Sequence, residues 1–211
     1  MADIRLIETP VHGRVLVRSG PPERLLAGFH GYAETGEIHL RELEQIPGAG
    51  EWSVVAVQAL HPFYVRSTQE VVASWMTRLD REAAIADNIE YVPRVLASFP
   101  AARTVVFAGF SQGAAMAWRA AAALGCAGLI ILGGDIPPEL PADGQLPPAL
   151  IGRGIRDDWY TDEKLRKDLS FLEGRCEART CVFDGGHEWR DEFRAAAGEF
   201  LRLLVTGHSN G

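Results

Sequence analysis

Short runs of apolar residues, bounded by glycine, proline or charged residues, recur along the chain. They predict strands at residues 11–17, 25–29, 52–60, 104–110, 128–132, 149–151 and 181–183. The first of these runs fits either a strand or a hairpin. Continuous apolar runs of this length are typical of strands that are buried on both faces, as in a parallel sheet.

Helical periodicity fills the intervals between the runs. One helix is marked by four apolar residues at helical spacing: Ile85, Ile89, Val92 and Leu96. Pro93 should kink or split that helix. An alanine-rich helix is expected over residues 112–124, with Gly125 as its C-terminal cap. The last helix shows an apolar face made of Trp189, Phe193, Ala197, Phe200, Leu201 and Leu204. This alternation predicts an α/β protein with a doubly wound, mostly parallel sheet flanked by helices.

Length and charge narrow the class of protein. The 211 residues suffice for one α/β domain, which we place at residues 1–206, followed by a flexible tail at 207–211. The formal net charge of −7 argues against nucleic acid or an anionic membrane as a partner. The charged start of the chain does not resemble a secretory signal, and no apolar run is long enough to span a bilayer. A cytoplasmic protein without stable membrane insertion is expected.

The three cysteines, Cys126, Cys176 and Cys181, are too few and too scattered for a disulfide framework. The pair at 176 and 181 lacks the partner cluster that a zinc site needs. We expect three free thiols and no bound metal.

The central motif is Gly109-Phe110-Ser111-Gln112-Gly113, a G-x-S-x-G sequence between a predicted strand and a predicted helix. This is the setting of a nucleophile elbow, a sharp turn that presents a serine at the end of a strand. Glycines on both sides of the serine let neighbouring backbone approach closely. The alternative is an ordinary glycine-rich turn between strand and helix. We favour Ser111 as a nucleophile.

A serine hydroxyl needs a base, and His187 is the best placed of the six histidines. It follows two glycines, between the last predicted strand and the last predicted helix, where this class of fold places its histidine. The alternative is a surface histidine at the start of a helix. Three other histidines are expected to face solvent: His12, His39 and His208.

The base needs an acid that orients it, expected in the loop after the penultimate strand. Two adjacent aspartates, Asp157 and Asp158, compete there. We favour Asp157, because its neighbour could cap the helix that begins near Thr161, although Thr161 is itself a good cap. Two further aspartates remain as alternatives: Asp135 and Asp184.

Backbone N–H groups should stabilise the oxyanion of such a reaction. One is expected from Gln112, the residue after the nucleophile. The other is expected from Tyr32, in the loop after an early strand. His30, in the same loop, could act as a base, but a buried histidine that fixes neighbouring backbone is the better interpretation.

These stretches resemble the phospholipase/carboxylesterase family of α/β-hydrolases, which includes acyl-protein thioesterases and small bacterial carboxylesterases. Ser74-Trp75 also looks like a pair that this family carries near its acyl site. The resemblance implies the α/β-hydrolase fold, without a large lid. It rests on four stretches in the family's order: Phe29-His30-Gly31-Tyr32, Gly109-Phe110-Ser111-Gln112-Gly113-Ala114, Gly154-Ile155-Arg156-Asp157 and Gly185-Gly186-His187.

The chain departs from the family near the expected substrate cleft. Arg153 stands where the family usually has histidine, and Asp158-Trp159-Tyr160 replace proline and small apolar residues. Residues 61–64 also differ from the usual loop. Three aromatic residues are candidates for the walls of the cleft, with core packing as the alternative for each: Phe63, Trp75 and Trp159.

The sequence therefore predicts a serine hydrolase that cleaves small acyl esters, and the resemblance extends this to thioesters or lysophospholipids. No metal or organic cofactor is implied. A dienelactone-type hydrolase or an acyltransferase on the same fold is an alternative, although the dienelactone type usually carries cysteine as its nucleophile. A non-catalytic binding module is a third hypothesis. A homodimer is left open.

Overall fold

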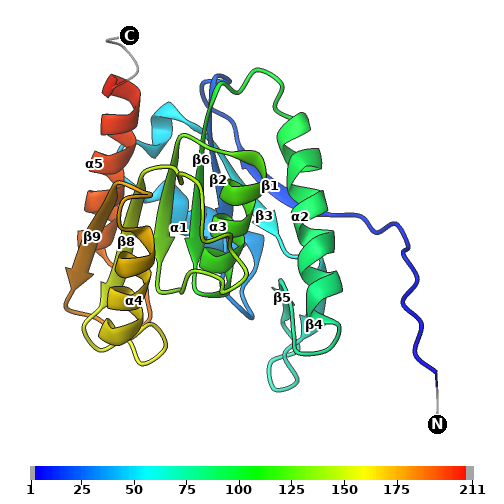
Figure 1. Ribbon diagram of the computed structural model, residues 1–211. Helices are drawn as coiled ribbons and strands as arrows, with labels where there is room; N and C mark the ends of the chain where they lie inside the picture. The colour runs from blue at the N-terminus through cyan, green and yellow to red at the C-terminus, as the bar shows by residue number, and fades with distance from the viewer. Residues whose placement is uncertain (1–2, 208–211) are drawn as a thin grey trace.

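The computed structural model describes residues 3–207 and places one central sheet between two layers of helices (Figure 1). Seven strands form this sheet: β1 Arg14–Arg18, β2 Arg24–Phe29, β3 Ser53–Gln58, β6 Thr104–Phe110, β7 Gly128–Leu132, β8 Ala149–Gly154 and β9 Ala178–Phe183. Their order is β1-β3-β2-β6-β7-β8-β9, and β1 with β3 is the antiparallel pair. The predicted mostly parallel sheet is confirmed.

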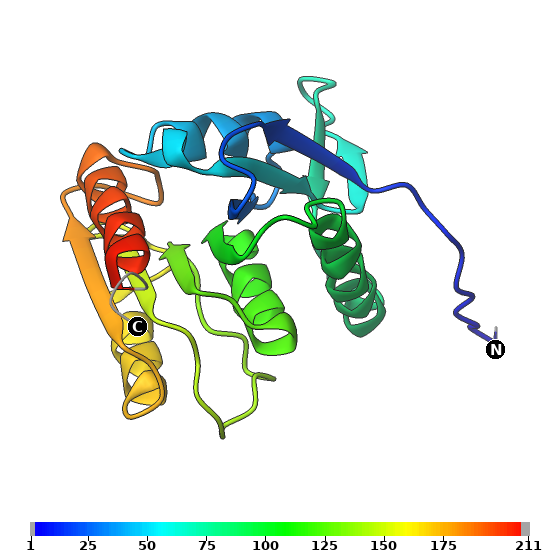
Figure 2. The ribbon, with the colours of Figure 1, turned by 90° about the horizontal axis from the view of Figure 1, so that it is seen from above.

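Five helices cover the two faces of the sheet: α1 Gly36–Glu44, α2 Arg81–Ala97, α3 Gln112–Leu124, α4 Asp162–Leu172 and α5 Asp191–Gly207. Figure 2 shows α1 and α5 on one side of the twisted sheet and α2, α3 and α4 on the other. A short 3₁₀ turn, Ala49–Glu51, follows α1. The doubly wound arrangement therefore agrees with the alternation of elements in the sequence.

Most strands of the sheet contribute side chains to two separate cores, because successive residues of a strand point to opposite faces. In β2, Leu25, Ala27 and Phe29 pack into the core beneath α2, α3 and α4. Leu26, between them, packs into the core beneath α1 and α5. This double burial explains why the strands appear in the sequence as continuous apolar runs.

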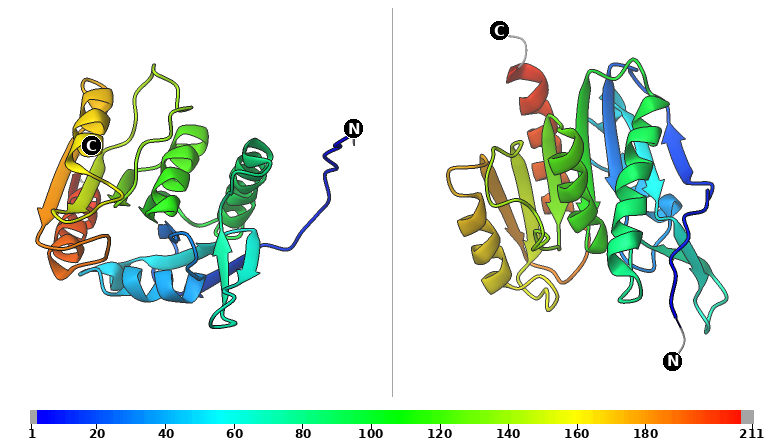
Figure 3. Two further views of the ribbon diagram at one scale, coloured as in Figure 1. Left: turned by 90° about the horizontal axis from the view of Figure 1, so that it is seen from below. Right: turned by 45° about the vertical axis from the view of Figure 1, so that its right-hand side comes forward.

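Several predicted boundaries need correction. The first strand begins at Arg14, and residues 3–13 extend away from the body without regular structure (Figures 1 and 3). Pro93 does not split α2, which is continuous from Arg81 to Ala97. Gly207 belongs to α5, whereas the rest of the predicted tail, with His208, lies outside the described residues. The hairpin β4 His61–Tyr64 and β5 Val71–Ser74 was not predicted.

Other local predictions are confirmed. Thr161 caps α4, because its Oγ1 accepts a hydrogen bond from the N–H of Lys164. The N–H of Gly125 donates to the carbonyl of Ala121 and ends α3. All three cysteines are free thiols. Within residues 3–207, none of the helices is both long and apolar enough to cross a membrane.

His39 does not face solvent, so this prediction is wrong. It lies on the inner face of α1, together with Gly36 and Leu43, and its side chain is fully buried. Its ring centroid lies 5.9 Å from that of Trp189, and neither ring nitrogen has a hydrogen-bond partner among the described residues. Burial lowers the pKa of His39 to about 3, since desolvation disfavours the charged imidazolium.

We predict that His39 makes the protein sensitive to acid. Between about pH 6.5 and 3 the unfolded chain binds a proton at this residue that the folded chain does not, so stability falls as the pH is lowered through that range. Thermal melts of His39→Leu should therefore depend less on pH between 7 and 4.5 than those of the wild type. His12→Leu, at an exposed histidine, is the control. Parallel curves for the wild type and His39→Leu would contradict this account.

Candidate active site

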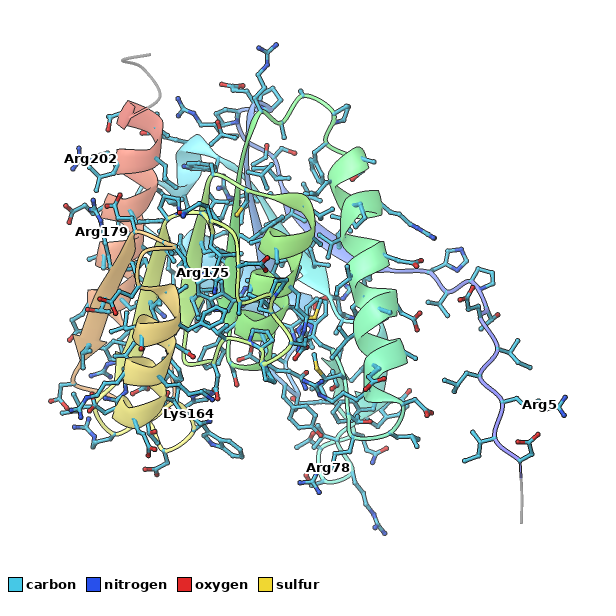
Figure 4. The ribbon with its side chains drawn as sticks, in the orientation of Figure 1. Arg5, Arg78, Lys164, Arg175, Arg179 and Arg202 are labelled. Atoms are coloured by element: carbon cyan, nitrogen blue, oxygen red, sulfur yellow. The ribbon has the colours of Figure 1, made fainter. Side chains whose placement is uncertain are left out.

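The candidate site lies where the carboxyl ends of three parallel strands meet at one edge of the sheet. Ser111 directly follows β6, Asp157 lies in the loop after β8, and His187 lies in the loop after β9. Lys164, at the start of α4, marks the same edge in Figure 4. In open α/β sheets this edge is the usual place for binding and catalytic residues.

The three side chains form one hydrogen-bonded chain. The Nε2 atom of His187 lies 2.8 Å from the Oγ atom of Ser111, and its Nδ1 atom lies 2.8 Å from Oδ2 of Asp157. Asp157 is almost completely buried, whereas Asp158 is exposed. Asp157 is therefore the aspartate that reaches His187. The other candidates pair elsewhere, Asp135 with Lys164 and Asp184 with Arg156.

The backbone at Ser111 adopts a conformation that side-chain-bearing residues rarely take. Its φ of 54° and ψ of −119° fall between the end of β6 and the start of α3. Gly113 allows the turn, because a Cβ there would lie 2.0 Å from the carbonyl oxygen of Phe29. Gly109 is required for a similar reason, since its Cβ would lie 2.4 Å from the carbonyl oxygen of Gly113. The turn has the features of a nucleophile elbow.

The imidazole of His187 is held by aromatic packing on one side. The Phe110 ring centroid lies 4.9 Å from that of His187, and Trp189 packs beyond Phe110 at 6.2 Å. Phe110, the last residue of β6, therefore directly precedes the serine and also packs against the ring of the histidine. The His187 side chain is about one-fifth exposed, so one side of the Ser111–His187 pair is open to solvent.

The loop after β2 is fixed by His30. The N–H of Ala59 donates to Nε2 of His30 (3.1 Å), so this nitrogen is the acceptor and Nδ1 carries the proton. Nδ1–H then donates to the carbonyl of Gly31 at 2.6 Å. Burial lowers the pKa of His30, which favours this neutral form. The predicted backbone-fixing role of His30 is confirmed.

Glu34, which belongs to none of the sequence motifs, fixes the same loop from the other side. Its Oε2 accepts the N–H of Gly31 at 2.7 Å, and burial raises the pKa of its carboxyl group. The N–H of Ala33 donates to Ala73 on β5. The N–H of Tyr32 is not among these bonds. The only sequence feature that could have indicated this bond is the position of the Glu34 carboxylate, three residues after Gly31.

The side chain of Gln112 provides a further anchor, which could not be predicted from the sequence motif. Its N–H is the first donor of α3, and such helix N-terminal amides lack a partner within the helix. Its side-chain Oε1 accepts the N–H of Trp75 (2.8 Å) and the hydroxyl of Ser74 (3.2 Å), and its Nε2 donates to the carbonyl of Met76 (2.9 Å). The glutamine after the serine therefore ties α3 to the segment that follows β5.

The three aromatic candidates for the cleft lie in different environments. Trp75 is fully buried, and its Nε1–H donates to the carbonyl of His30 (2.8 Å), so its ring belongs to the core and the prediction that it lines the cleft is wrong. Phe63 is half-buried and packs on the exposed ring of Tyr32, with centroids 5.7 Å apart. Trp159 is 73% exposed, and its contact with the site is the bond from its backbone N–H to Asp157.

Comparison with known proteins shows the fold. No family model matches the sequence, and no curated protein sequence matches it. Among solved structures, esterase PE8 superposes with a TM-score of 0.76 at 20% identity, over 92% of this chain and 100% of that one. The Bacillus cereus carboxylesterase gives 0.76 at 15% identity, over 91% and 94%. Acyl-protein thioesterase 2 of Zea mays gives 0.73 at 17% identity, over 92% and 100%. The chain has the α/β-hydrolase fold, as predicted.

We predict that Gln112→Ala destabilises the protein by about 1–3 kcal/mol, because it leaves the N–H of Trp75 and the carbonyl of Met76 without their partner. Urea unfolding measures the change. Gln45→Ala is the matched control, since Gln45 makes its side-chain bond, to Arg41, on the exposed surface of α1. Equal losses in the free energy of unfolding would show that the bonds of Gln112 stabilise the protein no more than the exposed bond of Gln45 does.

Proposed function

We propose that this protein is a serine hydrolase that cleaves carboxylic esters or thioesters through an acyl-enzyme on Ser111. The observation that carries the proposal is the hydrogen-bonded chain from Ser111 through His187 to Asp157, with the serine in a strained turn at the end of a strand. Nucleophile, base and orienting acid at these positions are the arrangement that serine hydrolases use.

In the first half of the reaction, Oγ of Ser111 attacks the carbonyl carbon of the substrate while Nε2 of His187 takes its proton. Asp157 accepts a hydrogen bond from Nδ1–H, which keeps Nε2 free as a base and stabilises the imidazolium. The backbone N–H groups of Tyr32 and Gln112 bind the carbonyl oxygen as it gains negative charge. The tetrahedral intermediate then expels the alcohol or thiol, which takes the proton from Nε2.

In the second half, a water molecule attacks the acyl-enzyme and gives a proton to Nε2 of His187. The new tetrahedral intermediate collapses, the bond from the acyl carbon to Oγ breaks, and Ser111 regains the proton as the acid leaves. Every proton in this sequence passes through Nε2. The chemistry needs no metal or organic cofactor.

The substrate class is supported by the names of the structural neighbours and by the chemistry of the site. These neighbours are named as an esterase, a carboxylesterase and an acyl-protein thioesterase. They agree with the family that the sequence motifs resemble. We propose small acyl esters or thioesters as substrates, because no inserted domain covers the Ser111–His187 pair within the described residues. The complete hydrogen-bonded chain argues against the alternative of a non-catalytic binding module that has the hydrolase fold without the activity.

We predict that Ser111→Ala lowers the hydrolysis of p-nitrophenyl esters by about four orders of magnitude or more, because no acyl-enzyme can form. Circular dichroism should show that the variant is folded. Ser98→Ala, at a serine that caps the end of α2, is the control and should keep full activity. Turnover at the wild-type rate in Ser111→Ala would rule out the proposed nucleophile.

The two neighbouring aspartates provide a second test. Asp157→Asn should cut turnover by roughly 10³- to 10⁴-fold, because the amide would favour the wrong tautomer of His187. Asp158→Asn removes the same charge one residue away, at an exposed position, and should change turnover little. Steady-state assays with one ester substrate decide between them. A larger loss in Asp158→Asn would contradict the proposed role of Asp157.

A further inference from the structure

Tyr160 is held at three points within the loop that carries Asp157. It is fully buried. Its backbone N–H donates to Oδ1 of Asp157 at 2.8 Å, and its carbonyl accepts a hydrogen bond from Nε of Arg153 at 3.0 Å. Its phenol donates to Oδ2 of Asp168 at 2.9 Å. Arg153 and Tyr160 are also two of the positions at which the chain departs from the family pattern.

We propose that Tyr160 is the positioning residue for Asp157. By fixing its own backbone N–H on Oδ1, it leaves Oδ2 directed at Nδ1 of His187. The inference rests on the proposed function, in which Asp157 orients the base.

The two oxygens of Asp157 have separate partners. Oδ1 accepts the N–H groups of Trp159 and Tyr160, both at 2.8 Å, and Oδ2 lies 2.8 Å from Nδ1 of His187. A carboxylate rotates readily about its side-chain bonds unless its oxygens are held. The position of Oδ2 therefore depends on where the backbone of residues 159 and 160 lies. That backbone is irregular and follows the end of β8, so other groups must fix it.

The phenol of Tyr160 anchors this backbone to two neighbouring elements. Asp168 is on α4 and is almost completely buried, and the same Oδ2 that accepts the phenol also accepts the N–H of Ile136 at 3.1 Å. Ile136 belongs to the loop after β7, the strand between β6 and β8. One carboxylate thus joins the loop of Asp157 to the loop beside the serine turn. Burial raises the pKa of Asp168 to about 6, and the group is an anionic acceptor above that pH.

Arg153, near the end of β8, makes the third of the contacts that hold Tyr160. Its side chain is buried, its Nε–H binds the carbonyl of Tyr160, and one of its terminal nitrogens lies 3.8 Å from the carboxylate of Asp162. A guanidinium can donate in several directions at once from a fixed plane. The hydrogen bond thereby links β8, which precedes the loop of Asp157, to Tyr160 within that loop.

Tyr160→Phe tests the proposal, because it keeps the buried ring and removes the hydroxyl. We expect kcat for ester hydrolysis to fall roughly 10- to 100-fold with KM nearly unchanged, since a displaced acid affects the chemical step more than substrate binding. Tyr91→Phe is the matched control. The hydroxyl of Tyr91, on α2, is buried and has no hydrogen-bond partner within residues 3–207, so its removal should leave kcat as in the wild type.

A second readout separates positioning from a loss of stability. Proton NMR of the folded protein should show a strongly downfield signal from Nδ1–H of His187 bonded to Asp157, and this signal should move upfield or broaden in Tyr160→Phe but not in Tyr91→Phe. Wild-type kcat together with an unchanged signal in Tyr160→Phe would overturn the proposal. So would an equal loss of kcat in Tyr91→Phe.

Two further cases need a separate measurement: a Tyr160→Phe variant that does not fold, and a wild type without hydrolase activity. If Tyr160→Phe does not fold, Asp168→Asn, which keeps an oxygen acceptor but weakens the bond to the phenol, should show the same changes to a smaller degree. Wild-type values in that variant would again overturn the proposal. If the wild type hydrolyses neither esters nor thioesters, the proposed function has failed, and the NMR signal alone decides whether Tyr160 positions Asp157.

Discussion

The strained backbone of Ser111 is the constraint on which the rest of the site depends. A non-glycine residue at a φ of 54° costs on the order of 1–3 kcal/mol and persists only where the surroundings enforce it. Here β6 ends and α3 begins within one residue, and α3 starts so close to the end of β2 that Gly113 has no room for a side chain. The packing of α3 against the sheet therefore holds the serine in place.

The loops around this turn are held by side chains more than by regular secondary structure. The loop after β2 is fixed by His30 and Glu34, the segment after β5 by Gln112, and the loop after β8 by Tyr160. The side chains of His30, Glu34 and Gln112 bond to backbone N–H or carbonyl groups that irregular segments would otherwise leave without partners. The phenol of Tyr160 instead bonds to the carboxylate of Asp168, and its backbone N–H bonds to Asp157. These polar side chains are not members of the chain Ser111–His187–Asp157, but they hold the loops that set the relative positions of its three residues.

The strands could be predicted from the sequence well enough to place the site, because buried parallel strands produce apolar runs and their carboxyl ends meet at one edge. Asp157 could be preferred to its neighbour because the stretch Gly154-Ile155-Arg156-Asp157 resembles the family pattern and because Asp158 could instead cap a helix. The short helix α1 was missed because its buried face consists of Gly36, His39 and Leu43, which gives no apolar periodicity. The β4–β5 hairpin was missed because most of β4 is exposed. The bonds of Gln112 join residues almost forty positions apart, and no local pattern encodes such contacts.

The central claim is that His187 activates Ser111, and labelling with a fluorophosphonate tests it most directly. Such a probe forms a stable bond with a serine only where a base removes the hydroxyl proton. The account predicts one adduct on the wild-type protein, located by peptide mass spectrometry at Ser111, and none on His187→Ala after the same exposure. A wild-type protein that remains unlabelled, or labelling of Ser111 at equal rates in the two proteins, would contradict it.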